Sequence, residues 1–300
     1  MKLIIFLKGV FFNMLALFFG LITLAIAIAI TVGINSYFSF DLMSFSIFFI
    51  LPLGSIVVGT IASFGYHFGS YLSNKKIDSW RLLLGLVIPI IAFIGVRYGY
   101  YATAYLDDDM NLNYKMIGEH VSNYSIEDSE EPLNFVSFTK LMVESSTISF
   151  TYRRRNMVNI EGKPVVNWIF FLIDLIGSVV GSLMAMGLVI RGRNYCENCE
   201  RYMKKQKELF SFPIGDVDTF IKMQDIKTLS SERIKSFLSC KASNNEEHYD
   251  VFINWCDKCF EGYINMKCFQ RDSRGRLVEN DKNNKDIKVS SDIVKTFLGV

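Results

Sequence analysis

Cysteine thiols are the side chains of this sequence whose spacing most clearly indicates chemistry. All six cysteines follow residue 190, at Cys196, Cys199, Cys240, Cys256, Cys259 and Cys268. Two pairs have C-x-x-C spacing, which lets both thiolates of a pair reach one tetrahedral ion from a tight turn. The sequence therefore predicts a Zn²⁺ site with the ligands Cys196, Cys199, Cys256 and Cys259, whereas Cys240 and Cys268 are expected to be free core thiols.

The predicted zinc is structural, because a full set of four thiolates leaves no open position for water and no nearby His or Glu motif supplies a base. Disulfides are disfavoured if this region is cytoplasmic, where thiols stay reduced. A thioredoxin-type redox pair needs a strand-to-helix context that neither motif clearly has. The spacing of haem or iron–sulfur ligands is absent.

The sequence pattern around these thiols predicts a small α+β, zinc-ribbon-like domain over residues 191–300. Apolar residues alternate over 249–255 as in a strand, and 263–269 can run back after the second motif. Residues 200–255 separate the two motifs, many more than the ~15–20 of a compact ribbon, so about 210–245 is expected to be a helical insertion. Downstream, 271–286 is expected to be a solvated linker and 292–298 a short helix.

The composition points to a helical membrane protein, with a hydrophobic share of 50% and a mean hydropathy of +0.25. Crossing the hydrocarbon of a bilayer takes about 20 apolar residues in a helix. Four segments qualify, at about 9–34, 42–64, 82–101 and 168–190. The expected fold class is therefore membrane all-α, a four-helix transmembrane bundle with three spans in 1–101 and the fourth at 168–190, followed by the cysteine-rich domain.

Basic residues near the ends of the spans predict their orientation. Lys2 and Lys8 precede the first span, and the connection between the second and third contains Lys75, Lys76 and Arg81. Several more basic residues directly follow the fourth span, whereas 35–41 has none. We expect a multi-pass protein of the inner (plasma) membrane, with both termini and residues 191–300 cytoplasmic.

The connection over 102–167 is placed outside the cytoplasm. It contains Arg153, Arg154 and Arg155, but it is rich in acidic residues and long enough for the charge rule to weaken. Within it, residues 133–152 have helix-like spacing followed by a β-branched cluster, so an amphipathic helix and a strand pair both stay open.

Small residues four apart predict close helix packing inside the bilayer. The second span has Ser55 and Gly59, and the fourth has Gly177 and Gly181. These stripes would serve packing within the bundle or the seam of a homo-oligomer.

Asp174 is a carboxylate deep in the fourth span, on the helix face of its glycine stripe. A charge at that depth costs roughly 2.5–3.5 kcal/mol on insertion scales, so it should face protein, with Arg97 as a candidate partner. Two interpretations of Asp174 stay open. In the first it belongs to a gating or proton-linked site, and in the second it is a buried polar contact that fixes helix register.

Two stretches of the sequence resemble a known kind of protein. They are Pro52-Leu53-Gly54-Ser55-Ile56 with Gly59, and Tyr195-Cys196-x-x-Cys199-x-Arg201-Tyr202. Together they resemble uncharacterised bacterial multi-pass inner-membrane proteins with a C-terminal zinc-ribbon-like tail. The resemblance implies an architecture and brings no activity with it.

The function is expected to be non-enzymatic, because the sequence has no P-loop, Rossmann glycine pattern, nucleophile elbow or H-E-x-x-H motif. We expect an integral membrane scaffold or receptor whose zinc-bound tail docks a cytoplasmic protein. The alternative is a membrane pore, carrier or effector subunit, in stress or defence, gated through the tail. Besides membrane lipid and that protein, a second copy of the chain is an expected partner. The net charge of +2 does not favour nucleic acid.

Overall fold

The structure is a computed structural model that describes residues 2–47, 51–125, 132–145, 147–152, 155–161, 163–191, 193–203, 205–216, 219, 223 and 246–299. Side chains are described from Met14 onward, except over 146–162. Cys240, predicted to be a free thiol, lies outside the described residues. The chain divides into two compact units, the first of Met1–Ser73 and Ile77–Arg191 and the second of Asn74–Lys76 and Gly192–Val300.

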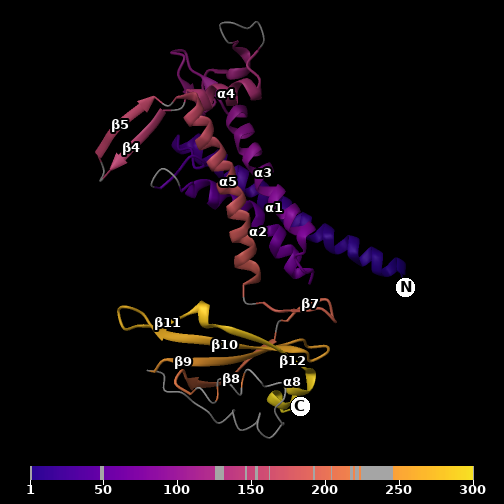
Figure 1. The fold of residues 1–300 in the computed structure, drawn as a ribbon. Helices are drawn as coiled ribbons and strands as arrows, with labels where there is room; N and C mark the ends of the chain where they lie inside the picture. Colours follow the sequence, from indigo (N-terminus) through magenta and orange to yellow (C-terminus); the bar gives the residue numbers. More distant parts are fainter. Residues whose placement is uncertain are drawn as a thin grey trace. The chain divides into compact units, whose positions relative to one another are not determined.

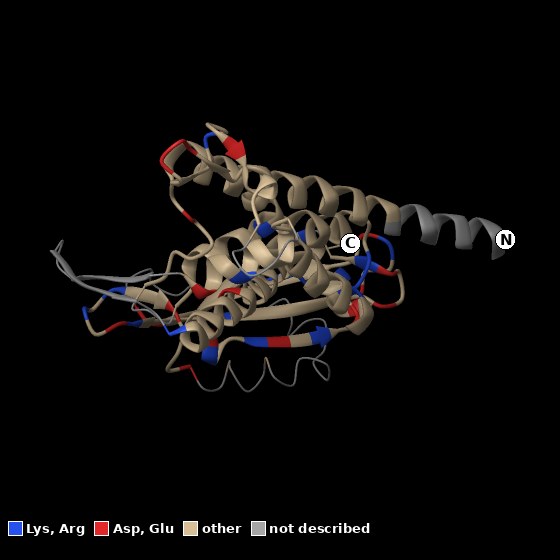
Figure 2. Cartoon of the chain, turned by 90° about the horizontal axis from the view of Figure 1, so that it is seen from above, with Lys and Arg blue, Asp and Glu red and all other residues tan. Residues whose placement is uncertain are grey.

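Long helices make up the first unit (Figure 1). They are α1 (Lys2–Phe38), α2 (Leu53–Leu72), α3 (Ser79–Ala102) and α5 (Pro164–Ile190). Three of them contain segments long and apolar enough to cross a membrane, at Met14–Phe38, Ser79–Ala102 and Pro164–Ile190. In Figure 2 these helices are drawn almost entirely in the colour of uncharged residues, whereas Lys, Arg, Asp and Glu gather on the loops and the strands. The apolar helical character expected of this region is therefore confirmed for three helices.

The second predicted span differs most from the structure. The sequence suggested one helix over 42–64, whereas α2 begins at Leu53 and continues to Leu72. Pro52 explains the late start, because the residue before a proline is disfavoured in the helical region and proline itself is tolerated only in the first turn. The helix extends past residue 64 because Gly65, His67 and Ser70, although not strongly apolar, are buried inside the unit.

Local signals likewise set the ends of two other helices. Asp78 caps α3 by accepting a hydrogen bond from the backbone N–H of Arg81 at 2.9 Å. Pro164 occupies the first turn of α5, where its missing N–H costs nothing, so α5 begins before the predicted residue 168.

The core of the first unit draws on all of its long helices. Its buried residues come from α1, α2 and α3, and Phe171 and Leu175 of α5 pack against them. Between α2 and α5 the backbones touch through small residues. A Cβ atom on Gly59 would lie 2.0 Å from the Ser178 carbonyl oxygen, and one on Gly181 would lie 2.2 Å from the Ile56 carbonyl oxygen. The stripes that the sequence suggested for packing thus lie in one interface, where no larger side chain fits.

The connection between α3 and α5 forms small elements of its own. β1 (Tyr105–Leu106) pairs with both β2 (Leu112–Asn113) and β3 (Glu119–His120), and the short helix η1 (Val121–Asn123) follows. Next come α4 (Phe135–Glu144) and the antiparallel hairpin of β4 (Thr147–Tyr152) and β5 (Arg155–Glu161). The two options for 133–152 are both realised, first helix and then strand.

The second unit is built on an antiparallel sheet, in which β8 (Lys205–Pro213), β9 (His248–Trp255) and β10 (Gly262–Arg271) are neighbours. β10 also pairs with β11 (Leu277–Glu279) and β12 (Lys285–Val289). The terminal helix α8 (Ser291–Leu298) contributes Ile293, Val294 and Phe297 to the core of this unit. A small β-sheet domain therefore follows the helical region, as expected.

Two segments of this unit differ from expectation. Residues 205–213 form strand β8, although 210–213 was assigned to a helical insertion. Residues 271–286 were expected to be a solvated linker, but they include β11, the short helix η3 (Asp281–Asn283) and the start of β12. Charged composition misled the prediction, because an edge strand pairs through its backbone while its side chains point to water.

The close approach of α2 and α5 gives a testable prediction. Gly181→Leu should disrupt the interface by forcing a side chain into the α2 backbone, at a cost of about 1–3 kcal/mol or more. We expect a clearly lower midpoint of thermal unfolding for the detergent-solubilised protein, followed by fluorescence. Gly187→Leu on the same helix is the matched control, because a Cβ there meets nothing within 4 Å. Equal midpoints for the two variants would contradict the packing described.

Candidate metal centre

The four cysteines of the two C-x-x-C motifs converge in the second unit. Their sulfur atoms all lie within 4.8 Å of one another, and the Sγ atoms of Cys196 and Cys259 are 3.5 Å apart. Cys196 and Cys256 are buried, whereas Cys199 and Cys259 are partly exposed. Residues nearly sixty positions apart in the chain thus present four thiols to one point.

The first motif lies on a short hairpin of β6 (Tyr195–Cys196) and β7 (Arg201–Tyr202), in which Cys196 pairs with Arg201. The Met203 N–H closes the hairpin by donating to the Asn194 carbonyl at 2.8 Å. Glu200, directly after the second cysteine, has a φ of 48°. This left-handed residue reverses the chain so that Cys196 and Cys199 face the same way.

The second motif connects the central strands β9 and β10. The Cys256 N–H donates to the Glu261 carbonyl at 2.9 Å, and the Phe260 N–H donates to the Cys256 carbonyl at 3.0 Å. Phe260 again directly follows the second cysteine, and its φ is 59°. At Gly262 a Cβ would lie 2.6 Å from the Asn254 carbonyl oxygen, so the turn needs glycine there. The two motifs therefore have the same local geometry on different hairpins.

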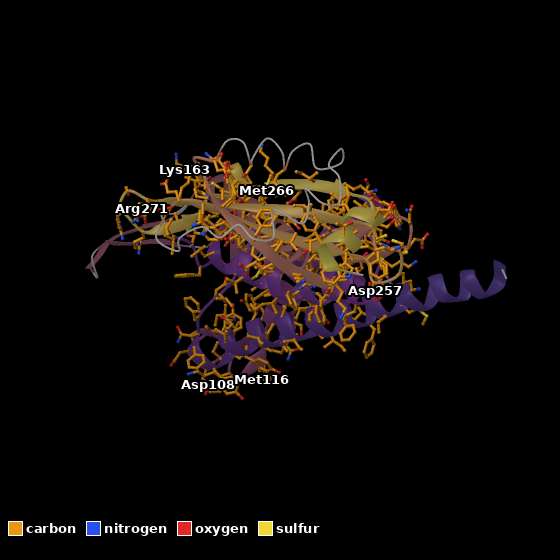
Figure 3. The ribbon with its side chains drawn as sticks, turned by 90° about the horizontal axis from the view of Figure 1, so that it is seen from below. Asp108, Met116, Lys163, Asp257, Met266 and Arg271 are labelled. Carbon is orange, nitrogen blue, oxygen red and sulfur yellow. The ribbon has the colours of Figure 1, made fainter. Side chains whose placement is uncertain are left out.

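Strand pairing explains how the long separation between the motifs is closed. β8 starts three residues after Tyr202 and runs antiparallel to β9, so that Lys205 lies opposite Trp255. That register puts the end of the first hairpin beside the start of the second motif. The intervening residues leave from the other end of the pair, where Pro213 lies opposite His248. In Figure 3, Asp257 of the second motif and Arg271 lie at opposite ends of the sheet, with Met266 between them.

Two polar contacts join the motifs around the sulfur atoms. The Arg201 guanidinium donates to the Asp257 carboxylate at 2.6 Å, and the Asn198 side-chain amide donates to the Glu261 carboxylate at 2.7 Å. This hydrogen bond from Arg201 holds the pKa of Asp257 below its usual value. These two contacts between the motifs were not predicted from the sequence. The signal that could have revealed the first contact is a basic residue, Arg201, just after the first motif and an acidic residue, Asp257, inside the second.

The electrostatics of the thiols suit a cation. Burial raises the pKa of Cys196, and a hydrogen bond with the Cys259 thiol raises the pKa of Cys199 to about 12. Burial also acts to raise the pKa of Cys256, but backbone N–H groups of Cys259 and Lys258 and neighbouring thiols outweigh it and lower that pKa. Without a cation, the four cysteines do not all ionise together, because neighbouring thiolates repel one another. A metal ion would therefore have to displace their protons.

The arrangement fits zinc better than a disulfide. Four sulfurs at ~2.3 Å from a tetrahedral Zn²⁺ are about 3.8 Å apart, close to the spacing found here. The 3.5 Å between Cys196 and Cys259 is far longer than the ~2.05 Å of an S–S bond. The structure therefore shows a cluster of four cysteines that is a candidate metal site, consistent with zinc. When bound, the ion would cross-link the two hairpins.

The remaining predicted site residues lie elsewhere. Cys268 is fully buried in the core of the sheet unit, as expected of a core thiol. Asp174 is also buried, and its Oδ2 lies 3.9 Å from Nη2 of Arg97, the partner that the sequence suggested. Gly177 approaches Pro52 and Ser55 in the interface of α2 with α5.

Comparisons with known proteins place this chain in no family. No protein-family model, curated protein or solved structure matches the chain. The resemblance noted from the sequence therefore holds only as an architecture, three candidate membrane helices and a C-terminal cluster of four cysteines.

Metal content tests the site. We expect the purified full-length protein to hold one zinc ion per chain by inductively coupled plasma mass spectrometry. Cys256→Ser should lose nearly all of it, because removing one ligand opens a site whose binding supplies on the order of 10–16 kcal/mol in zinc peptides. Cys268→Ala is the matched control, since it removes a buried thiol outside the cluster and should keep the metal. A metal-free wild-type protein, or equal zinc in both variants, would rule the site out.

Proposed function

We propose that the protein is a non-enzymatic integral membrane scaffold or receptor whose zinc-bound cytoplasmic tail docks a partner protein. The observation that supports this most is the closed ligand set. Four sulfur donors leave a tetrahedral ion no open position for water or substrate, which is typical of structural rather than catalytic zinc. Such a site makes a small domain rigid, and rigid domains suit recognition.

The proposal includes four membrane crossings with both termini in the cytoplasm. α2 is not among the three helices that contain a long apolar segment, but its 20 residues of helix are about 30 Å long, enough to cross the hydrocarbon. Its polar residues Ser55, Ser63, His67 and Ser70 are buried within the bundle rather than turned to lipid. α2 therefore suits a crossing that is shielded by α1 and α5.

The aromatic residues next to the second motif do not form the docking surface. Trp255 and Phe260 pack against the core of the sheet unit, and Tyr263 packs against the cysteine cluster. The opposite face of the central strands offers Phe252, Lys267 and Phe269, all partly exposed. We propose that the partner contacts this face, whose shape depends on the metal through β9 and β10.

Binding of a purified partner tests the function. The full-length protein is isolated from its own cells, a co-purifying protein is identified and produced separately, and its affinity for the solubilised protein is measured. Zinc-loaded wild type and Cys268→Ala should bind alike, whereas Cys256→Ser and chelator-treated protein should bind at least about tenfold more weakly, a loss of about 1.4 kcal/mol. Full binding by Cys256→Ser, with its membrane insertion intact, would remove the proposal.

The orientation has its own test. A peptide tag placed after Val300 should resist protease added outside intact cells and be cleaved once the membrane is opened. This follows from the many Lys and Arg residues after α5, which are held on the cytoplasmic side. A tag inserted after Asp108, in the connection over 102–167, should behave in the opposite way. Cleavage of the C-terminal tag in intact cells would overturn the cytoplasmic location of the zinc domain.

A second candidate function is a membrane pore, carrier or effector subunit gated through the tail. It is favoured by a cluster of charges in the helical unit, where Arg97 lies within 4.0 Å of both the partly exposed Asp41 and the buried Asp174. Charged groups within membrane segments often mark pathways for ions or protons.

A further inference from the structure

Two carboxylates share one guanidinium in the helical unit. Arg97 Nη1 donates to Asp41 at 3.2 Å, and Nη2 lies 3.9 Å from Asp174. Arg97 is also flanked by the rings of Phe93, Tyr100 and Phe171 at 5.4 to 5.7 Å, which favour its cationic form. With both acids ionised the cluster carries one net negative charge, so it calls for one further positive charge.

The two carboxylates are held very differently. Asp41 accepts hydrogen bonds from the Ser44 hydroxyl at 2.6 Å, the Tyr100 hydroxyl at 2.9 Å and the Met43 N–H at 2.9 Å. These donors stabilise its ionised form. Asp174 is 7% exposed and has only the longer contact with Arg97 from a charged group. The Ser55 hydroxyl beside it donates its hydrogen to the Met43 carbonyl at 2.8 Å. Asp174 is therefore the carboxylate that takes the extra charge.

The surroundings of Asp174 indicate that the further positive charge is a proton. Among the described residues, its charged neighbours are Arg97 of α3 and Asp41 before α2, and Asp41 is in turn bonded by Tyr100, on which Tyr114 packs. α2 presents Ser55 there, and α1 has no charged residue from Met14 to Phe38. A metal ion would need several oxygen ligands beside a fixed guanidinium that repels it. A proton needs only one carboxylate oxygen, and the Ser55 side chain is the hydrogen-bonding neighbour of Asp174 there.

A second proton acceptor lies further along the same helix interface. The Ser182 hydroxyl donates to the Gly85 carbonyl at 2.8 Å, so its oxygen is left to accept from His67 Nε2 at 3.3 Å. The neutral imidazole then carries its hydrogen on Nε2, and Nδ1 keeps a free lone pair. His67 is fully buried, and within the described residues its Nδ1 has no hydrogen-bond partner. A buried basic nitrogen without a donor is suited to receive a proton or a water molecule.

We propose that the interior of the helical unit is a proton path, in which Asp174 and His67 are the proton-binding residues. Asp174 takes one proton from water at its end of the path, which forms an O–H bond and removes the net charge. The same proton then passes over buried hydroxyl groups of the α2–α5 interface to His67 Nδ1, and from there to the other side. Ser182, the partner of His67, lies about two α5 turns, or about 12 Å, from Asp174. Ser63, fully buried one turn before His67 and unpartnered among the described side chains, lies on the way.

The proposal deepens the second candidate function and does not depend on partner docking. Purified full-length protein is reconstituted in liposomes that contain a pH-sensitive dye, and a potassium diffusion potential drives proton entry. Wild type and Asp174→Glu should acidify the lumen, whereas Asp174→Asn and His67→Gln should slow it by about a hundredfold. Glutamine keeps a donor for Ser182 but has no basic nitrogen. Asp108→Asn is the matched control, because it makes the same change on an exposed acid.

The possible results separate the hypotheses. All variants are first compared with wild type by size-exclusion profile, and if Asp174→Asn is misfolded, His67→Gln decides. Liposomes with wild-type protein that stay tight to every ion would overturn the proton path and the second candidate function together. Proton flux unchanged in Asp174→Asn and His67→Gln would overturn the path alone. Uptake of radioactive sodium that needs Asp174 would replace the proton by a metal cation.

Discussion

A polar or charged group removed from water needs a partner inside the protein, and both units are organised around this requirement. In the helical unit it decides where α2 lies. This helix has serines, a histidine and glycines where its neighbours have leucine and isoleucine, and its polar side chains are buried rather than exposed to the surroundings. The glycines of α2 and α5 let the backbones approach so closely that Thr60 donates to the Gly181 carbonyl at 3.1 Å.

In the sheet unit the same requirement applies to the cysteine thiols. Four thiols meet at one end of the central strands, where two hairpins with the same left-handed turn face each other. The pairs Arg201–Asp257 and Asn198–Glu261 hold the hairpins together around them. The apolar core of Val251, Ile253, Ile264 and Met266 lies directly beyond, so the proposed metal would secure the end of a sheet that is already well packed.

Much of this arrangement could be predicted from the sequence, because the signals were local. The C-x-x-C spacing identified the four cysteines that cluster, and the apolar runs located three of the helices. What escaped prediction depends on contacts between distant residues. The start of α2 follows from Pro52, but its extension to Leu72 follows from neighbours that bury His67 and Ser70. Strand β8 and the strands after Arg271 are too polar to be recognised alone. Backbone hydrogen bonds stabilise them, from β9 to β8 and from β10 to β11 and β12.

The sheet register also has a practical consequence for this chain. The residues between Pro213 and His248 leave and rejoin the sheet at the end away from the cysteines. Met223 of this segment lies in the core of the sheet unit, so an insertion that keeps Met223 in place would leave Lys205 opposite Trp255 and one cysteine pair in position relative to the other. A fluorescent protein or an affinity handle inserted between those strands would report on the folded tail while its sulfur cluster stays intact.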